Sequence, residues 1–289
     1  MGGGSFDDQA YHQSSVTRAS QGISDFDYSS KATEVHATLD PLRINKKKAG
    51  ILESCDSTEH PESTAIIFTF DVTGSNIDNA VIAQKRLPEL MSKLVAVISN
   101  PQVAIWANDD ARCQGRNSIQ ISEFESDNRI DEAISNIWLT GDGGGNGGES
   151  YDLLIYAAAR KVKTDCFTKR GKKGYMFLYA DEPFREIVSK KEVKLIFDDN
   201  LEVNIPIGDM IAEAQQKWNI FVLWPRRGYV NAREQYEELF GKDHVIHVEG
   251  PDTICDTVAS LVASEEEKMK LTAELAISAA SGDYVNRVE

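Results

Sequence analysis

Acidic residues directly follow two apolar runs of this sequence. The first run, residues 65–70, leads into Asp71, Thr73 and Ser75, and a later apolar run leads into Asp181. The alternate spacing of Asp71, Thr73 and Ser75 lets one carboxylate and two hydroxyls point the same way in an extended segment. Mg²⁺ prefers such hard oxygen ligands in octahedral geometry. The residue types therefore predict a divalent-cation site for Mg²⁺, with Mn²⁺ and Ca²⁺ as alternatives.

Strand and helix patterns alternate along the chain from residue 65 onward. We expect an α/β fold, a doubly wound, mostly parallel sheet flanked by helices. Ligands bind in such sheets beyond the carboxyl ends of the strands, where both acidic segments fall. The predicted strands are residues 65–70, 103–107, 119–124, 175–180, 220–224 and 245–248, with the second and third paired as a hairpin. The predicted helices are residues 79–98 (kinked or restarted at Pro88), 127–138, 149–163, 209–218, 232–240 and 252–263, the last running on into 265–270.

Three segments are expected to differ in organisation. Residues 1–60 are rich in Ser, Asp, Gln and Gly and are interpreted as an N-terminal arm, residues 61–263 as the domain, and residues 264–289 as a short helical tail. Within the domain, residues 190–206 are predicted to form an inserted hairpin that turns at 198–200.

The site residues also carry a family resemblance. Asp71-x-Thr73-x-Ser75 resembles the Asp-x-Ser-x-Ser motif of von Willebrand factor A domains, and the Gly-rich loop at 141–148 and the strand ending at Asp181 follow in that family's order. The resemblance covers residues 64–263 and looks closest to the bacterial and phage branch of the family.

What the resemblance implies is a metal-ion-dependent adhesion site. Asp71, Thr73, Ser75 and Asp181 match the family's ligands. The usual second-loop threonine is replaced, so Asn146 becomes the expected ligand there, and Glu149 stands in reserve, coordinating through a water. A position left open on the ion would accept a carboxylate from a protein partner.

The resemblance implies a binding protein and not an enzyme, with no catalytic residues. Similar bacterial domains serve as adaptors of MoxR-type AAA+ ATPases, so such an ATPase is one expected partner. The alternative is a structural component of a phage particle that uses the same fold as a scaffold. A haloacid-dehalogenase-type phosphatase would need a second acid where Thr73 stands, and the glycines of residues 143–148 lack the preceding strand of a dinucleotide site.

Composition narrows the partners further. The net charge is −15, from 46 acidic and 31 basic residues, which disfavours nucleic acid and anionic membranes as partners. The four cysteines show no pairing rhythm and are expected to be free thiols in a reducing compartment. The first residues resemble no secretory signal. The expected location is the cytoplasm, or the virion if a phage encodes the protein.

Overall fold

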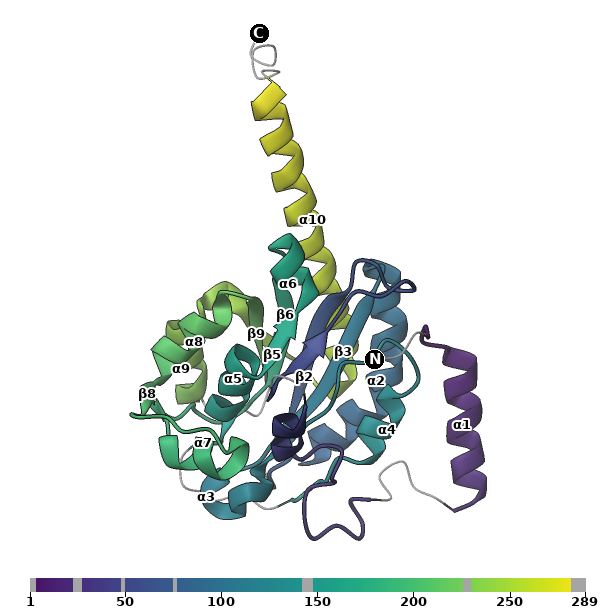
Figure 1. The fold of residues 1–289 in the computed structure, drawn as a ribbon. Helices are drawn as coiled ribbons and strands as arrows, with labels where there is room; N and C mark the ends of the chain where they lie inside the picture. The colour runs from purple at the N-terminus through teal and green to yellow at the C-terminus, as the bar shows by residue number, and fades with distance from the viewer. Residues whose placement is uncertain are drawn as a thin grey trace.

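A six-stranded sheet in the order β10-β9-β6-β2-β3-β4 forms the centre of the computed structural model (Figure 1). The structure describes residues 4–22, 28–47, 50–74, 77–141, 148–225 and 230–281. All neighbouring strands of this sheet are parallel except β3 and β4. Counted along the chain, the strands lie in the doubly wound order 3-2-1-4-5-6. The predicted fold class is confirmed. The strands are β2 (Thr64–Asp71), β3 (Pro101–Asn108), β4 (Ile119–Ile121), β6 (Gly174–Tyr179), β9 (Trp218–Pro225) and β10 (Val245–Val248).

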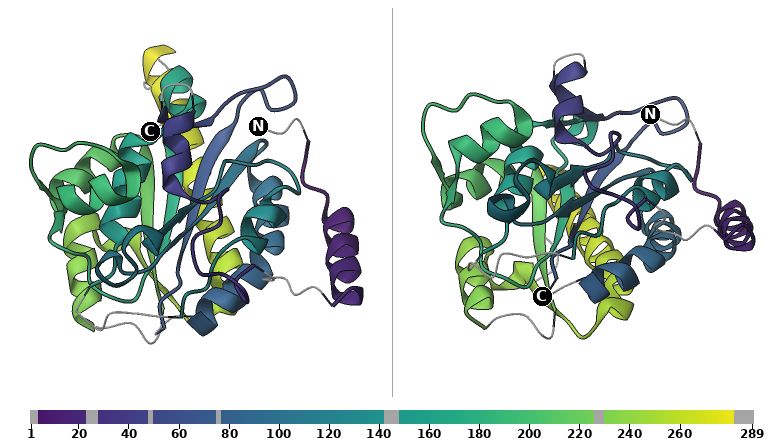
Figure 2. Two further views of the ribbon diagram at one scale, coloured as in Figure 1. Left: turned by 60° about the horizontal axis from the view of Figure 1, so that its bottom comes forward. Right: turned by 90° about the horizontal axis from the view of Figure 1, so that it is seen from below.

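Helices cover both faces of the sheet (Figure 2). One core cluster joins α5, α7, α8 and α9 to the odd-numbered side chains of β2, among them Ile67. The other joins α2, α4 and α10 to the even-numbered side chains, among them Phe68. Because successive strand residues point to opposite faces, strands covered on both faces need the continuous apolar runs that the sequence shows. The helices are α2 (Ile77–Val97), α3 (Ala111–Gln114), α4 (Ile130–Ser135), α5 (Tyr151–Arg160), α6 (Asp165–Arg170), α7 (Lys190–Phe197), α8 (Ile207–Gln215), α9 (Val230–Phe240) and α10 (Ile254–Ser281).

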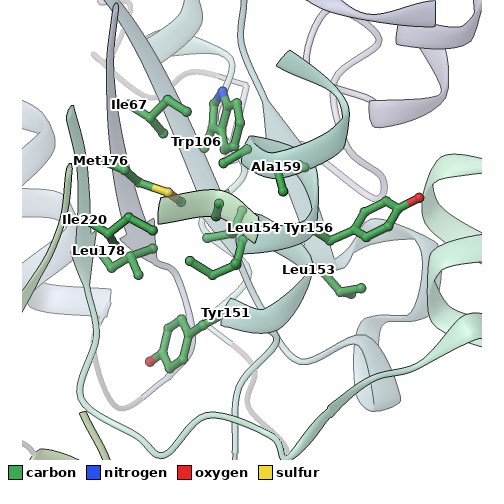
Figure 3. Close-up of a cluster of buried hydrophobic side chains, with 14 of the residues drawn as sticks. Ile67, Trp106, Tyr151, Leu153, Leu154, Tyr156, Ala159, Met176, Leu178 and Ile220 are labelled. Carbon is green, nitrogen blue, oxygen red and sulfur yellow. The ribbon is translucent and has the colours of Figure 1, made fainter. Parts of the chain in front are cut away.

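Helix α5 lies directly on the sheet. Its residues from Tyr151 to Ala159 are all buried, and Leu154 faces strand side chains such as Met176 and Leu178 (Figure 3). The Trp218 indole nitrogen donates a hydrogen bond of 2.9 Å to the Ala158 carbonyl. This packing fixes the N-terminus of α5 at the end of the sheet where the site lies.

The segment before β2 packs on the domain over much of its length. It contains α1 (Asp8–Ser20), a 3-10 turn (Pro41–Lys46) and β1 (Leu52–Ser54), which pairs with β5 (Val162–Thr164). The carbonyl of Leu39 accepts a 2.8 Å hydrogen bond from the amide of Ile121 on the edge strand β4. The segment thereby covers an edge that would otherwise be free to pair with another chain. Helix α1 has no buried residue and stands apart from the sheet (Figure 1).

The predicted hairpin at 190–206 is wrong. Residues 190–197 form α7, whose Val193, Ile196 and Phe197 are buried at helical spacing. Asp198 ends the helix in the left-handed conformation, with φ 57°. Two short strands flank α7 in the sequence, β7 (Ile187–Val188) before it and β8 (Ile205–Pro206) after it. They pair with each other in antiparallel orientation. The buried apolar residues of this segment recur with the period of a helix. Residues 198–200, which were predicted as the turn of a hairpin, follow the end of α7.

Several predicted helix bounds also need correction. Helix α5 ends at Arg160, not 163, because Val162–Thr164 forms β5. Helix α2 continues through Pro88 without the predicted restart, α4 is shorter than predicted, and α8 ends before Trp218 begins β9. Helix α10 is longer than predicted and extends past the end of the sheet opposite to the strand carboxyl ends (Figure 1).

All four cysteines are free thiols, as the sequence predicted. Among the described residues, no helix is long and apolar enough to cross a membrane.

Gly174 is expected to tolerate no side chain. A Cβ there would come within 2.5 Å of the Trp218 ring and 2.8 Å of the Ala65 carbonyl. Gly174→Ala should therefore lower the free energy of unfolding by about 2 to 3 kcal/mol through overpacking. Urea denaturation checks this, with Gly208→Ala as the control. Gly208 lies in α8 with nothing within 4 Å of its Cβ position, so that change should be neutral or stabilising.

Asp56 is expected to stabilise the protein only above acidic pH. Burial opposes its charge, but hydrogen bonds from Arg170, Ser63 and Lys169 outweigh burial and hold its pKa well below the usual range. The stabilisation is present above the unfolded-state pKa of about 3.9 and is lost as the pH falls through the folded-state pKa.

The test compares the wild type with Asp56→Asn. At pH 7 the variant should be about 1.5 to 3 kcal/mol less stable, and the difference should shrink as the pH falls below about 4. Glu53→Gln is the control, because Glu53 is exposed and its contact with Lys163 is 4.0 Å long. A difference that stays constant down to pH 2 would contradict the role of the charge.

Candidate metal centre

The acidic residues predicted from the sequence meet where β2 and β6 end. Asp71 is the last residue of β2, and Asp181 follows β6 by two residues. Both strands are parallel neighbours, so their carboxyl ends share one edge of the sheet. Glu149 lies two residues before α5 begins, and its segment forms a single β-bridge with Phe184 of the loop after β6. This bridge ties the second acidic segment to the third.

Asp71 is completely buried. Its Oδ1 accepts hydrogen bonds from the Thr73 backbone amide at 2.9 Å and from the Thr73 hydroxyl at 2.6 Å. Its Oδ2 accepts a hydrogen bond from the Tyr151 hydroxyl. The predicted pair Asp71 and Thr73 is therefore brought together, with the hydroxyl oxygen beside the carboxylate.

Tyr151 connects the two strand ends. Its hydroxyl oxygen lies 3.4 Å from Asp181 Oδ1 and accepts a 3.3 Å hydrogen bond from the Asp181 amide. Tyr151 was not predicted as a site residue, because in the sequence its position looks like one more buried residue on the apolar face of α5. Only the contact between the start of α5 and both strand ends gives Tyr151 a place in the site.

Glu149 is buried without a full set of partners. Its side chain is 2% exposed, and among the described residues its Oε2 has no hydrogen-bond partner. Burial, then the charges of Asp71, Glu182, Asp110 and Asp109, raise the pKa of Glu149 to about 9. All of these neighbouring charges are negative, so Glu149 lies in a strongly electronegative environment.

Burial and neighbouring negative charges also raise the pKa values of Asp71 and Glu182. Burial, followed by the charge of Asp181, raises the pKa of Asp71 to about 8, against hydrogen bonds from Thr73 and Tyr151 that lower it. Burial and the charge of Asp181 also raise the pKa of Glu182. The centre thus holds carboxylates whose negative charges are costly while no cation is bound.

A second group of polar residues follows β3, and the sequence analysis missed it. Asp109 and Asp110 are fully buried. The Thr140 hydroxyl donates to Asp109 and, at 3.0 Å, to the Val72 carbonyl, which links this group to the loop after β2. The acid pair Asp109-Asp110, one residue beyond the predicted strand 103–107, was the available signal.

Arg185 anchors the loop after β6 to this second group. It forms a buried ion pair with Asp110, donates 3.0 Å to the Ser150 hydroxyl and lies 3.3 Å from Glu192. Ser150 in turn accepts a 2.8 Å hydrogen bond from the Ala111 amide at the start of α3. These contacts fix the loops that carry Asp181 and Glu149 relative to each other.

The described residues fit a divalent cation in chemistry but supply only part of a shell. Asp71, Thr73, Asp181 and Glu149 offer carboxylate and hydroxyl oxygens, and the buried Glu149 Oε2 has no hydrogen-bond partner among the described residues. Two predicted ligands, Ser75 and Asn146, lie outside the described residues. Within the described ranges, no three carboxylate, imidazole or thiolate side chains form a ready metal cluster. A shell at this position would therefore need hydroxyl oxygens and water besides the carboxylates.

Comparison with known proteins finds similarity to solved structures only. None of the protein-family models matches the sequence, and no curated protein is significantly similar. The solved structure of proximal thread matrix protein 1 from the mussel byssus is 14% identical at a TM-score of 0.48, over 73% of this chain and 48% of that one. The solved structure of the pilus adhesin SpaC from Lactobacillus rhamnosus GG is 10% identical at a TM-score of 0.49, over 71% of this chain and 30% of that one.

A von Willebrand factor type A structure from Catenulispora acidiphila is also similar. It is 13% identical at a TM-score of 0.43, over 70% of this chain and 42% of that chain. This chain spans less than half the length of each of these three proteins. The strand order seen here is itself that of a Rossmann-like sheet, with an antiparallel edge.

Proposed function

We propose that this protein is a metal-ion-dependent binding module. A divalent cation, Mg²⁺ or alternatively Mn²⁺ or Ca²⁺, is held by Asp71, Thr73 and Asp181, by Ser75, and by a second-loop residue. The cation offers an open position to a carboxylate on a protein partner. The observation that carries the proposal is the set of buried carboxylates at the ends of β2 and β6, together with Glu149, whose Oε2 has no partner among the described residues.

The electrostatics of the site support a cation. Taking a carboxylate out of water costs several kcal/mol unless an opposite charge compensates it. The negative charge of Asp181 repels that of Asp71, and the charge of Asp71 repels that of Glu149. A divalent ion between them would turn this repulsion into attraction and neutralise about two charges.

Two residues, Asn146 and Glu149, are candidates for the ligand from the second loop. Asn146 would add a neutral amide oxygen, whereas Glu149 would add a third carboxylate to the site. A third carboxylate would make the ion less attractive to an external acid. Glu149 is buried, and its Oε2 has no hydrogen-bond partner among the described residues. Both observations support coordination of the cation by Glu149, directly or through a coordinated water.

The first experiment is a calorimetric titration with Mg²⁺ and with Mn²⁺. We expect saturable binding by the wild type and none by the Asp71→Ala/Asp181→Ala double variant. Glu234→Gln is the control, because Glu234 is an exposed acid on α9, outside the site. Absence of binding by the wild type would sink the proposal.

The partner is sought in a second step. A protein that binds the wild type in Mg²⁺, is released by EDTA and does not bind Asp71→Ala would be the expected carboxylate donor. A MoxR-type AAA+ ATPase is one such partner. The same experiment separates the adaptor from the alternative role.

The alternative is a structural component of a larger assembly such as a phage particle. The observation that favours it is α10, which extends beyond the body of the domain with Leu271 and Leu275 exposed (Figure 1). An assembly component should enter its particle equally well with Asp71→Ala. Loss of incorporation with that variant would count against a purely structural role.

A further inference from the structure

Asn108, the last residue of β3, is buried with an unsatisfied side chain. It is 0% exposed, and among the described residues neither its Oδ1 nor its Nδ2 has a hydrogen-bond partner. Its backbone is well paired, since its carbonyl accepts a 3.0 Å hydrogen bond from the Val72 amide. Buried amides are almost always hydrogen-bonded, because leaving both ends unpaired costs free energy. An unpaired amide in this position indicates a bound group that none of the described residues supplies.

The strand register places Asn108 beside Asp71. The two residues are direct Cα partners in the parallel pair β2·β3. Neighbours in register point to the same face of a sheet. Trp106, two residues earlier on β3, belongs to the core cluster on the α5 side, so Asn108 faces that side as well. The unpaired amide therefore lies next to the carboxylate that ends β2, on the face that carries Tyr151.

The protein does not use this neighbour as a partner. Both oxygens of Asp71 are engaged by Thr73 and Tyr151, and no hydrogen bond joins Asp71 to Asn108. An asparagine carbonyl is a ligand that hard cations accept, and it adds an oxygen without adding charge. At a site already rich in carboxylates, a neutral oxygen completes a shell with no further repulsion.

We propose that Asn108 is part of the cation site and that its Oδ1 binds the ion directly or through one of the ion's waters. The proposal deepens the proposed function and rests on it. Asn108 thereby brings a fourth chain segment, the end of β3, to a site that the sequence predicted from three. The amide nitrogen is left to donate to a coordinated water or to a carboxylate of the site.

The test compares cation binding by Asn108→Leu, Asn108→Asp and a matched control. Thr69→Val is the control, because the Thr69 hydroxyl is also buried and has no partner within the described ranges, and it lies on the same face of β2 two residues before Asp71. We expect Asn108→Leu to raise the Kd for Mg²⁺ at least about tenfold, and Thr69→Val to change it less than about twofold. Asn108→Asp keeps an oxygen donor and should retain binding.

A second readout separates a ligand from a structural amide. Leucine replaces an unpaired polar group, so the cation-free Asn108→Leu protein should melt no lower than the wild type, while its stabilisation by Mg²⁺ is reduced. Asn108→Ala repeats the comparison if the leucine variant fails to fold. Wild-type affinity in these variants, with a lower melting temperature without cation, would assign Asn108 to a buried water and overturn the inference. No Mg²⁺ binding by the wild type would instead overturn the proposed function itself.

Discussion

Asp71→Asn is expected to weaken Mg²⁺ binding at least about a hundredfold and to stabilise the cation-free protein. The loss of affinity follows because one of the two carboxylates that neutralise the ion is removed. The gain in stability follows because Asp71 is wholly buried beside Asp181, and burial and that neighbouring charge raise its pKa to about 8. A neutral amide keeps the shape: its oxygen can accept from Thr73, and the Tyr151 hydroxyl can accept a hydrogen bond from its nitrogen.

The size of the stabilisation should be on the order of 2 kcal/mol in denaturant unfolding near pH 8, without a divalent cation. The pH dependence of this stabilisation follows from the difference between the folded-state and unfolded-state pKa of Asp71. A carboxyl group with a raised folded-state pKa stabilises the protein below its unfolded-state pKa of about 3.9, and that contribution is lost as the pH rises through the folded value. The advantage of Asp71→Asn over the wild type should therefore grow as the pH rises from 4 to 8.

Asp152→Asn is the matched control for this prediction. Asp152 is equally buried, and burial raises its pKa to about 7. Its neutralisation should also stabilise the protein but should leave Mg²⁺ affinity unchanged. Equal loss of affinity in both variants would mean that general negative potential, and not ligation by Asp71, governs cation binding.

Arg185→Met is expected to lower the free energy of unfolding by about 3 to 5 kcal/mol. The guanidinium is 5% exposed and pairs with Asp110, which is completely buried. Methionine fills similar space but leaves the Asp110 carboxylate without its charge partner. The same change removes the hydrogen bond to Ser150 that holds the start of α5, so cation affinity should fall as well.

Arg112→Met supplies the control for the ion pair. Arg112 is 56% exposed at its side chain and lies 3.9 Å from Glu192, a residue that Arg185 also contacts. An exposed pair of this kind contributes about 0 to 1 kcal/mol. Adding Asp110→Asn to Arg185→Met should recover part of the lost stability, because no unpaired charge then remains buried. A loss below 1 kcal/mol in Arg185→Met would contradict the anchoring role.

The sequence was informative where a single rule governs a segment. Strands β2, β6 and β9 are covered by helices on both faces, so each must be apolar throughout, and each was predicted within about two residues at either end. The acids Asp71 and Asp181 stand at strand ends, and parallel strands bring such ends together. The fold class and two of the acids of the site could therefore be predicted from local pattern alone.

Local pattern failed where two periods compete over a short span. Residues 190–197 carry β-branched and aromatic side chains, which suggested a strand, but Val193, Ile196 and Phe197 bury one helical face. The end of α5 was missed for a similar reason, because Val162–Thr164 pairs with β1, more than a hundred residues earlier in the chain. A distant partner leaves no trace in the segment itself.

The sequence by itself determined the strands of the central sheet and the polar residues at the ends of β2 and β6, because both follow from residue type and spacing. Only the tertiary structure decided which side chains surround those acids. Tyr151 falls within a predicted helix and Asn108 just after a predicted strand, and no local pattern singles out Arg185. Their roles arise because α5, β3 and the loop after β6 converge on one edge of the sheet. Such convergence depends on contacts between residues far apart in the chain.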